Sequence, residues 1–202
     1  MKYRKALGIV AFGILMVGGY RWGYPESGVT LTTQDYIDLQ QLTGGYPYKI
    51  DQCTNSGYDY ADQYTEDGIF GVSSEWGSAG KVWFKGREEL ARAGGGGKDG
   101  CRPRWTAPGR AEVHHIVTSQ VFVPAAGGVK GKSTLMAVTS ATADSPAKIE
   151  WQGGYEDTFV KTAKGWRFKT RFHVWPGHPW PDTAAEQMKL MTAPPAPKDA
   201  PK

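Results

Sequence analysis

The second half of the sequence contains four long segments in which apolar and polar residues alternate, and this pattern restricts the fold more than any other feature. The segments cover residues 113–123, 132–142, 149–162 and 165–175. Alternation with a period of two is typical of β-strands that bury one face. Turns rich in Gly, Pro, Ala and Asp separate the segments. The sequence therefore predicts a long antiparallel meander.

The first half of the chain is predicted to be mainly helical. A helix start is indicated at residues 32–35, and apolar residues then recur at helical spacing. Gly44, Gly45 and Pro47 interrupt this pattern, because glycine is flexible and proline clashes with the preceding helical turn. We therefore expect a kink or break in the first helix, followed by a short second helix at residues 58–65.

Shorter elements connect the helical half to the strands. Residues 81–85 suit a strand and residues 87–93 a helix, whereas the glycine-rich residues 94–100 predict a flexible loop, placed where a pocket lid could be. Helices followed by a long meander predict an α+β domain, with the helices packed on one face of a curved sheet. A chain of 202 residues is long enough for one such domain with a substantial core.

The N-terminus is predicted to direct export. A basic head precedes an apolar stretch that is shorter than the ~20 residues of a typical membrane-spanning helix. We expect residues 1–22 to be an export signal or an uncleaved membrane anchor, so that the domain is periplasmic or faces outward from the membrane. The formal net charge of +4 comes largely from this basic head. The remaining chain lacks the excess of positive charge that is typical of a nucleic-acid-binding protein.

The rest of the chain is divided by composition. Residues 23–30 are predicted to be a linker, and residues 31–178 the folded domain. Residues 179–202 form a C-terminal extension, which is expected to be disordered at least from residue 193 because Pro, Ala and Lys dominate there.

The chain has two cysteines, Cys53 and Cys101. In an exported protein they can form a disulfide that ties the end of the first helix to the loop before the first long strand. The alternative is a pair of buried thiols. Neither cysteine has a histidine at metal-ligand spacing, so a metal site is disfavoured.

Several short sequence motifs in the middle of the chain are similar to motifs of one known family. They are residues 58–70 (YDYADQYTEDGIF), 86–88 (GRE), 114–117 (HHIV), 154–157 (GYED) and 165–171 (GWRFKTR). In this order and spacing they resemble the SnoaL-like branch of the nuclear transport factor 2-like superfamily. The resemblance implies a cone-shaped fold, in which a curved mixed or antiparallel sheet wraps around N-terminal helices and encloses one pocket. It also implies a homodimer or higher homo-oligomer.

The resemblance places two catalytic candidates in the pocket. His115 matches a family histidine on the first long strand, and Asp51 matches an aspartate that closes the first helix. A carboxylate beside an imidazole gives an acid or base suited to neutral pH. The alternatives are a helix cap for Asp51 and a buried hydrogen bond for His115. The related dehydratases have a further histidine on the next strand, and residues 132–142 have none.

Aromatic and polar side chains are expected around this pair. Tyr48 and Tyr64 are candidates to hold a water or a substrate oxygen, although most rings in such a chain build the core. Strand alternation places Ser119, Val117 and Val121 on the same face as His115 and places His114 on the other. The remaining substrate-binding candidates are Tyr60, Trp83, Ser119, Tyr155 and Arg171.

Arg171 has a second interpretation. It is expected to form a structural ion pair with Asp157 on the neighbouring strand, since buried charges need partners. A less favoured alternative is an anion clamp for the substrate.

The family includes dehydratases, ketosteroid isomerases, polyketide cyclases and epoxide hydrolases, and fold alone does not choose among them. The first hypothesis is a cofactor-independent lyase that removes water, or formaldehyde, from a hydrophobic, hydroxylated aromatic molecule. The second is a ligand-binding or oligomer-forming module without turnover. The third is an isomerase or cyclase that uses Asp51 alone as its base. No cofactor, metal or nucleic acid is expected, and any membrane contact is limited to the N-terminal segment.

Overall fold

The computed structural model describes residues 29–102, 112–140 and 145–186, and these residues form an α+β fold. The predicted export segment and the end of the C-terminal extension lie outside the described residues. No helix in the described ranges has the length and apolar character needed to cross a membrane. The elements are α1 (Thr33–Gln52), η1 (Thr54–Gly57), α2 (Tyr58–Ala61), β1 (Tyr64–Ser73), β2 (Lys81–Lys85), α3 (Arg87–Ala93), β3 (Glu112–Ala125), β4 (Gly128–Ser140), β5 (Lys148–Thr162) and β6 (Gly165–Val174).

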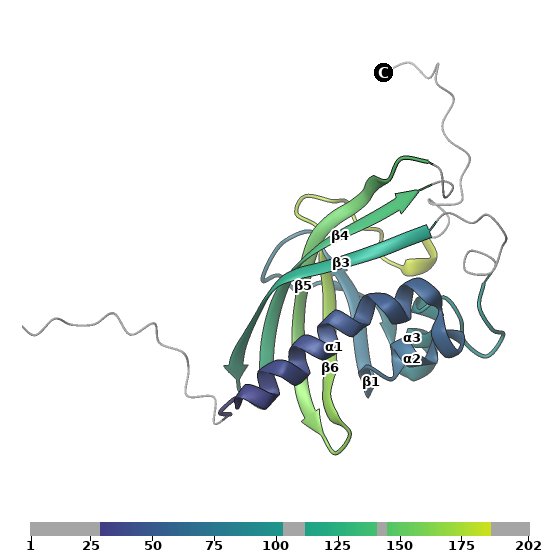
Figure 1. The fold of residues 1–202 in the computed structure, drawn as a ribbon. Helices are drawn as coiled ribbons and strands as arrows, with labels where there is room; N and C mark the ends of the chain where they lie inside the picture. The colour runs from purple at the N-terminus through teal and green to yellow at the C-terminus, as the bar shows by residue number, and fades with distance from the viewer. Residues whose placement is uncertain (1–28, 103–111, 141–144, 187–202) are drawn as a thin grey trace, which may run out of the picture.

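Within the described residues, six strands form one curved sheet in the order β2-β1-β6-β5-β4-β3 (Figure 1). Strands β3 to β6 form the predicted antiparallel meander, whereas β1 pairs parallel with β6. Figure 1 shows α1 running along the sheet beside β3, with α2 and α3 together near one end of α1. The edge strand β3 therefore faces the helix that is predicted to contribute the catalytic aspartate.

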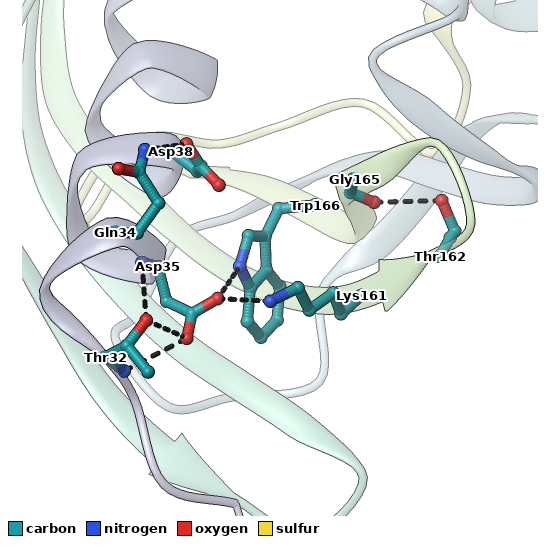
Figure 2. Close-up of polar contacts among 8 residues, drawn as sticks. All are labelled: Thr32, Gln34, Asp35, Asp38, Lys161, Thr162, Gly165 and Trp166. Carbon is teal, nitrogen blue, oxygen red and sulfur yellow. Dashed lines mark hydrogen bonds and ion pairs between the residues drawn. The ribbon is translucent and has the colours of Figure 1, made fainter.

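The start of α1 is fixed to the β5–β6 hairpin through Asp35 (Figure 2). One carboxylate oxygen accepts hydrogen bonds from Lys161 Nζ at 2.7 Å and Trp166 Nε1 at 2.9 Å. The other accepts from the backbone and hydroxyl of Thr32, which caps the helix. Lys161 and Thr32 lower the pKa of Asp35 well below its usual value. The side chain of Asp35 therefore both caps the start of α1 and anchors it to the β5–β6 hairpin.

Helix α1 is continuous, so the predicted break is absent: it is a single helix from Thr33 to Gln52 with Pro47 inside it. Leu39, Thr43 and Tyr46 are almost fully buried at helical spacing on one face. This packing against the sheet holds the helical path, because tertiary contacts routinely override local propensity.

The predicted second helix is too long. Helix α2 ends at Ala61, and β1 already begins at Tyr64. The amide of Phe168 in β6 donates to the carbonyl of Gln63 at 3.0 Å. Pairing with β6 therefore draws this segment into the sheet.

The folded part of the chain continues beyond the predicted boundary at residue 178. Trp180 and Ala184 are buried, and Trp180 Nε1 donates to the carbonyl of Ser73 at 2.9 Å. Lys81 also binds the carbonyl of Trp180 at 2.6 Å and the carboxylate of Asp182 at 2.8 Å. The first part of the C-terminal extension is thus packed on β1 and β2.

Candidate functional site

A pocket of about 630 Å³ lies between the C-terminal half of α1 and the edge strand β3. Its helix wall is formed by Gly44, Pro47, Tyr48, Asp51 and Gln52, and its strand wall by residues 113–117. The helix residues follow the spacing i, i+3, i+4, i+7 and i+8, which places them on one face of α1. The volume is within the range typical of small-molecule sites.

Asp51 and His115 meet at this pocket, as the sequence predicted. One oxygen of Asp51 bonds with the ring Nδ1 of His115, and the other accepts from the backbone N–H of His115 at 2.8 Å. Each side chain is about 10% exposed. Since a carboxylate can only accept, Nδ1 carries the hydrogen, and Nε2 is the nitrogen left to take or give a proton.

The ring of His115 is enclosed by two aromatic side chains. Tyr46 meets it edge-on at 6.0 Å and Trp151 at 5.7 Å between ring centroids. His115, Ala137 and Trp151 lie in register across β3, β4 and β5. The small, fully buried side chain of Ala137 leaves space for the histidine and tryptophan rings to contact each other. His115 is therefore held by a carboxylate on one side and by rings on another.

A disulfide lies directly after the pocket's acidic end. Cys53 pairs with Cys101, which confirms the cross-link that the sequence allowed. Cys53 adopts the left-handed conformation and ends α1, and Asn55 and Ser56 also have positive φ. Such backbone is costly for non-glycine residues and persists only where the surroundings impose it. Asp51 is therefore located two residues from a covalently fixed helix end.

The glycine-rich loop predicted as a possible lid is attached to the same segment. Gly97 N donates to the carbonyl of Ser56 at 2.7 Å, and Gly96 N donates to the carbonyl of Ala91 at 3.0 Å. Glycine is required at 96, because an added Cβ would lie 2.1 Å from the carbonyl oxygen of Ser56. The loop contains no regular element, as predicted, and none of its residues lines the described pocket.

The predicted tyrosines separate into two groups. Tyr48 lines the pocket and is 70% exposed. In contrast, Tyr60 and Tyr64 are buried and share a hydroxyl–hydroxyl hydrogen bond of 2.7 Å, and Tyr155 shares one of 3.0 Å with Tyr46. Burial raises the pKa of Tyr46 to about 12 and the pKa of each of the other three buried tyrosines well above the ordinary value. The buried tyrosines build the core and are not in the pocket wall.

Arg171 is fully buried and forms the predicted structural ion pair with Asp157. Its Nε and Nη2 donate to the two carboxylate oxygens at 2.9 and 3.0 Å. Burial opposes the charge, but Asp157 outweighs this effect and raises the pKa of Arg171 above its usual value. The guanidinium also lies 3.9–4.2 Å from the ring centroids of Tyr46, Tyr155 and Phe168. Arg171 does not line the described pocket, so it is not an anion clamp there, although its Nη1 has no hydrogen-bond partner.

Ser119 does not share the pocket face with His115, so that prediction is wrong. The register shifts between Thr118 and Val121, and Ser119 has a φ of 52°, as in a β-bulge. The extra residue reverses the alternation, so that Phe122 is buried while Val121 is 58% exposed. His115 precedes the bulge and keeps its predicted inward orientation.

Trp83 is also far from the pocket in the sheet order. It lies on β2, at the opposite edge from β3. Its Nε1 donates to the carbonyl of Pro181 at 3.3 Å, and its ring meets Trp180 edge-on at 5.4 Å. Trp83 therefore packs the C-terminal extension against the sheet.

Sequence reasoning missed Gly44, Pro47 and Gln52 as pocket residues and Trp151 as a neighbour of His115. The first three share a helical face with Tyr48 and Asp51, so helical spacing from Asp51 could have found them. Trp151 depends on strand register, which the sequence does not specify. In the described part of the chain, no three His, Cys, Asp or Glu side chains are grouped to hold a metal ion.

Comparison with known proteins defines the family. A family model for the SnoaL-like domain matches residues 32–172, so the chain belongs to the SnoaL-like domain family. No curated protein matches the sequence.

Solved structures of similar fold include a variant of Rv3472, a protein of unknown function from Mycobacterium tuberculosis, with 23% identity and a TM-score of 0.53 over 69% of this chain and 70% of that one. ActVI-ORFA from Streptomyces coelicolor has 19% identity and a TM-score of 0.53, covering 69% and 96% of the two chains. An NTF2-like protein with a cystatin-like fold from Novosphingobium aromaticivorans has 18% identity and a TM-score of 0.51, covering 78% and 89%. At these identities the likeness concerns the fold, which is NTF2-like.

Proposed function

We propose that this protein is a cofactor-independent lyase that acts on hydroxylated aromatic small molecules, with Asp51 and His115 as its acid–base pair. The observation that supports this proposal is the double hydrogen bond from His115 to Asp51 at the wall of an open pocket. A carboxylate that fixes the tautomer and orientation of an imidazole leaves one nitrogen ready for proton transfer.

In an elimination of water, His115 Nε2 takes a proton from the carbon next to the hydroxyl-bearing carbon. The electron pair of that C–H bond forms the new double bond, and the C–O bond breaks. The leaving hydroxyl takes a proton, either from Tyr48 or back from His115, and departs as water. Where Tyr48 supplies the proton, the proton held by His115 then returns to Tyr48. Tyr48 is the tyrosine suited to this step because it lines the pocket, whereas Tyr64 is buried and bonded to Tyr60.

Loss of formaldehyde uses the same groups. His115 takes the hydroxyl proton of a hydroxymethyl substituent, the carbon–carbon bond breaks, and formaldehyde leaves. The ring carbon then receives the proton from His115. Both reactions balance without an oxidant or reductant. Loss of water breaks a C–H and a C–O bond, whereas loss of formaldehyde breaks an O–H and a C–C bond, and the mass that is lost distinguishes them.

A binding module without turnover is the second candidate. The observation that favours it is the interior of the fold, which is filled with buried rings. Tyr46 and Tyr155 lie against the guanidinium of Arg171. Tyr60 packs on Tyr46, and Tyr64 packs on Tyr60. An isomerase or cyclase that uses Asp51 alone is less favoured, because both Asp51 oxygens accept hydrogen bonds from His115.

We propose further that the domain is exported and that it forms a homodimer. The disulfide between Cys53 and Cys101 supports export, because disulfides persist in oxidising compartments. On the outer face of the sheet, Met136 of β4 pairs with Ile116 of β3, and Val138 of β4 pairs with Ile149 of β5. Ile116 and Ile149 are 43% and 58% exposed, and this apolar patch supports pairing through the outer face of the sheet.

Mass spectrometry tests the function. The purified protein is incubated with a panel of hydroxylated and hydroxymethylated aromatic compounds, beside the Asp51→Asn and His115→Gln variants. We expect a product lighter by water or formaldehyde that forms only with the unaltered protein. An unchanged mass with tight retention of the ligand by all three proteins would favour the binding module, and a rearranged product of unchanged mass would favour the isomerase.

A further inference from the structure

The chain after β6 folds back onto β1 and β2 as a strap, residues 175–186. The amides of Trp175 and Gly177 donate to the carbonyls of Ser73 and Ser74, each at 3.0 Å. The strap contains no strand and only a short helical stretch at its end. A few hydrogen bonds and ring contacts therefore hold it to the sheet, which is typical of segments that open locally.

The ring of Trp180 in this strap lies against two histidines. It meets His173 of β6 edge-on at 5.1 Å and His178 of the strap edge-on at 4.3 Å between ring centroids. His178 in turn stacks on Trp175 at 4.2 Å. His173 is 6% exposed and Trp180 is 9% exposed. The strap therefore contributes to the burial of His173.

His173 has no carboxylate partner among the described residues that would stabilise a proton on its ring. Its Nε2 lies 3.2 Å from the carbonyl of Gln152, so this nitrogen carries the hydrogen of the neutral ring. The charged groups that act on it are His115, His178 and Arg171, and each of them disfavours its protonation.

The residues that neighbour His173 on the adjacent strands and in the strap add no charge. Tyr155 of β5 lies in register with it, and burial raises the pKa of Tyr155 well above its ordinary value. Val72 of β1 is also in register and is apolar. From the strap, the rings of Trp175 and Trp180 contact the imidazole. A protonated His173 is therefore a buried charge without a partner, which is costly.

Opening of the strap and protonation of His173 are linked. In the closed fold, burial lowers the pKa of His173 to about 4 from an ordinary value of 6.5. Once Trp180 moves away, His173 reaches water and its pKa returns towards the ordinary value. The open form therefore takes up a proton between pH 6.5 and 4 that the closed form refuses. Across this window the ratio of open to closed molecules rises by at most about 300-fold as the pH falls.

We propose that residues 175–186 are an acid-released latch, in which protonation of His173 frees the strap from β1 and β2 while the sheet stays folded. The latch is a property of the fold and does not depend on the proposed function. Its release exposes the rings of Trp83 and Trp180, which contact each other edge-on at 5.4 Å in the closed form. The domain thus presents more apolar surface in acidic surroundings.

Amide hydrogen exchange, measured by NMR on the full-length protein, tests the latch. The hydrogen-bonded amides of Trp175 and Gly177 report on the contact between the strap and the sheet, and that of Phe168 in β6 reports on the sheet itself. Protection factors are compared at pH 7, 6, 5 and 4.5, after correction for the intrinsic exchange rate. The range ends there because Lys81 holds the pKa of Asp182 below 3.8, so that their ion pair titrates at lower pH.

Three variants separate the latch from a general sensitivity to acid. His173→Gln keeps a donor for the carbonyl of Gln152 but does not titrate. Trp180→Leu removes the ring that contacts His173 and the hydrogen bond to the carbonyl of Ser73. Thr118→Gln, at an exposed position on β3, is the control.

We expect the strap amides to be roughly 100-fold or more less protected than the amide of Phe168 at pH 7, because the strap opens without unfolding the sheet. Their protection should fall about 50-fold between pH 7 and 4.5 in the unaltered protein and in Thr118→Gln. In His173→Gln it should fall no more than about fivefold, and this remainder comes from His178, whose pKa is also lowered by burial. Trp180→Leu should lower the protection of the strap at pH 7 and leave that of Phe168 within about twofold.

Two results would overturn the latch. Equal protection of the strap amides and of Phe168 at every pH would show that the strap opens only when the whole domain unfolds. An equal decrease in His173→Gln and Thr118→Gln would show that His173 does not control the opening. Both results concern amide exchange and leave the lyase untouched, because the lyase is tested by the product that forms.

Discussion

Asp51 binds His115 at two points, the ring Nδ1 and the backbone amide, and thereby joins the last turn of α1 to the edge strand of the sheet. The two residues are 64 positions apart in the chain. The backbone contact fixes where the strand lies, and the ring contact fixes how the imidazole is turned. One carboxylate therefore both positions an element and orients the group proposed to move the proton.

Replacement of Asp51 by Asn should lower kcat/KM on the order of 10²–10⁴-fold, because an amide no longer fixes the hydrogen of His115 on Nδ1. Ligand affinity should change much less, since the side chain keeps its shape. Steady-state kinetics with the substrate found by mass spectrometry measure both. Asp38→Asn on the same helix is the control, because Asp38 bonds to Gln34 and does not line the pocket. Equal turnover by Asp51→Asn and Asp38→Asn would contradict the proposed pair.

Removal of the buried arginine should be costly. Arg171→Met leaves Asp157 buried without its partner and should lower the free energy of unfolding by about 3–5 kcal/mol, measured by urea denaturation. Arg87→Met is the matched control, because Arg87 also binds a carboxylate through two nitrogens, that of Asp62, but both side chains are about half exposed. That variant should lose no more than about 1 kcal/mol.

The Arg171–Asp157 pair can be tested further with the double variant Arg171→Met/Asp157→Leu. It should recover part of the lost stability, because no charge is then buried alone. A double variant that is less stable than Arg171→Met would show that the aspartate is needed for another reason.

The residues that build these two sites differ in how far the sequence predicts them. The strand carrying His115 follows from alternation, and Asp51 follows from its position at the end of a helix in a recognised family pattern. The Asp157–Arg171 ion pair was predictable, because the sequence motifs that contain the two residues fall on consecutive strands. The orientation of Ser119 was not predictable. One extra residue in β3 reverses the face of the sheet to which each later residue of the strand points, and hydrophobic alternation does not show where such a bulge occurs.

The continuity of α1 shows a second limit. Gly44, Gly45 and Pro47 argue locally for a break, yet Tyr46 in their midst is fully buried and shares a hydroxyl contact with Tyr155 on β5. The free energy that maintains the helix here comes from contacts with residues more than a hundred positions away. The pocket wall at Gly44 depends on the same contacts, because helical spacing connects Gly44 with Asp51 only while α1 continues without a break.

Loss of the disulfide should destabilise the protein and disturb its acidic site. Replacing Cys53 and Cys101 with serine opens a loop with a sequence separation of 48, and the chain-entropy relation gives about 4 kcal/mol less stability. We also expect kcat/KM to fall, because Asp51 lies two residues before Cys53. Equilibrium unfolding and kinetics measure the two effects. Dithiothreitol should reproduce them in the unaltered protein and have no effect on the serine variant. A serine variant with unchanged stability would contradict this account.

Stability should fall in acid partly because of His173, which is buried among aromatic rings on β6. Burial lowers the pKa of His173 to about 4 from an ordinary value of 6.5. Between pH 6.5 and 4 the unfolded chain takes up a proton at this position that the folded protein refuses, so the free energy of unfolding decreases as the pH falls. This difference amounts to about 3 kcal/mol across the window, and it ceases to grow once both states are protonated.

His173→Gln tests this effect, because glutamine can still donate to the carbonyl of Gln152, which lies 3.2 Å from Nε2 of the histidine, but does not titrate. Urea unfolding at pH 7, 6, 5 and 4 should show a shallower loss of stability for this variant than for the unaltered protein. Thr118→Gln, at an exposed position on β3 that does not titrate, is the control and should keep the original slope. Aspartates such as Asp62 and Asp67 have pKa values lowered by Arg87 and Lys169 and add their own loss at lower pH in all three proteins, so the difference between the curves isolates His173. Equal slopes for His173→Gln and Thr118→Gln would show that His173 does not resist protonation in the folded protein.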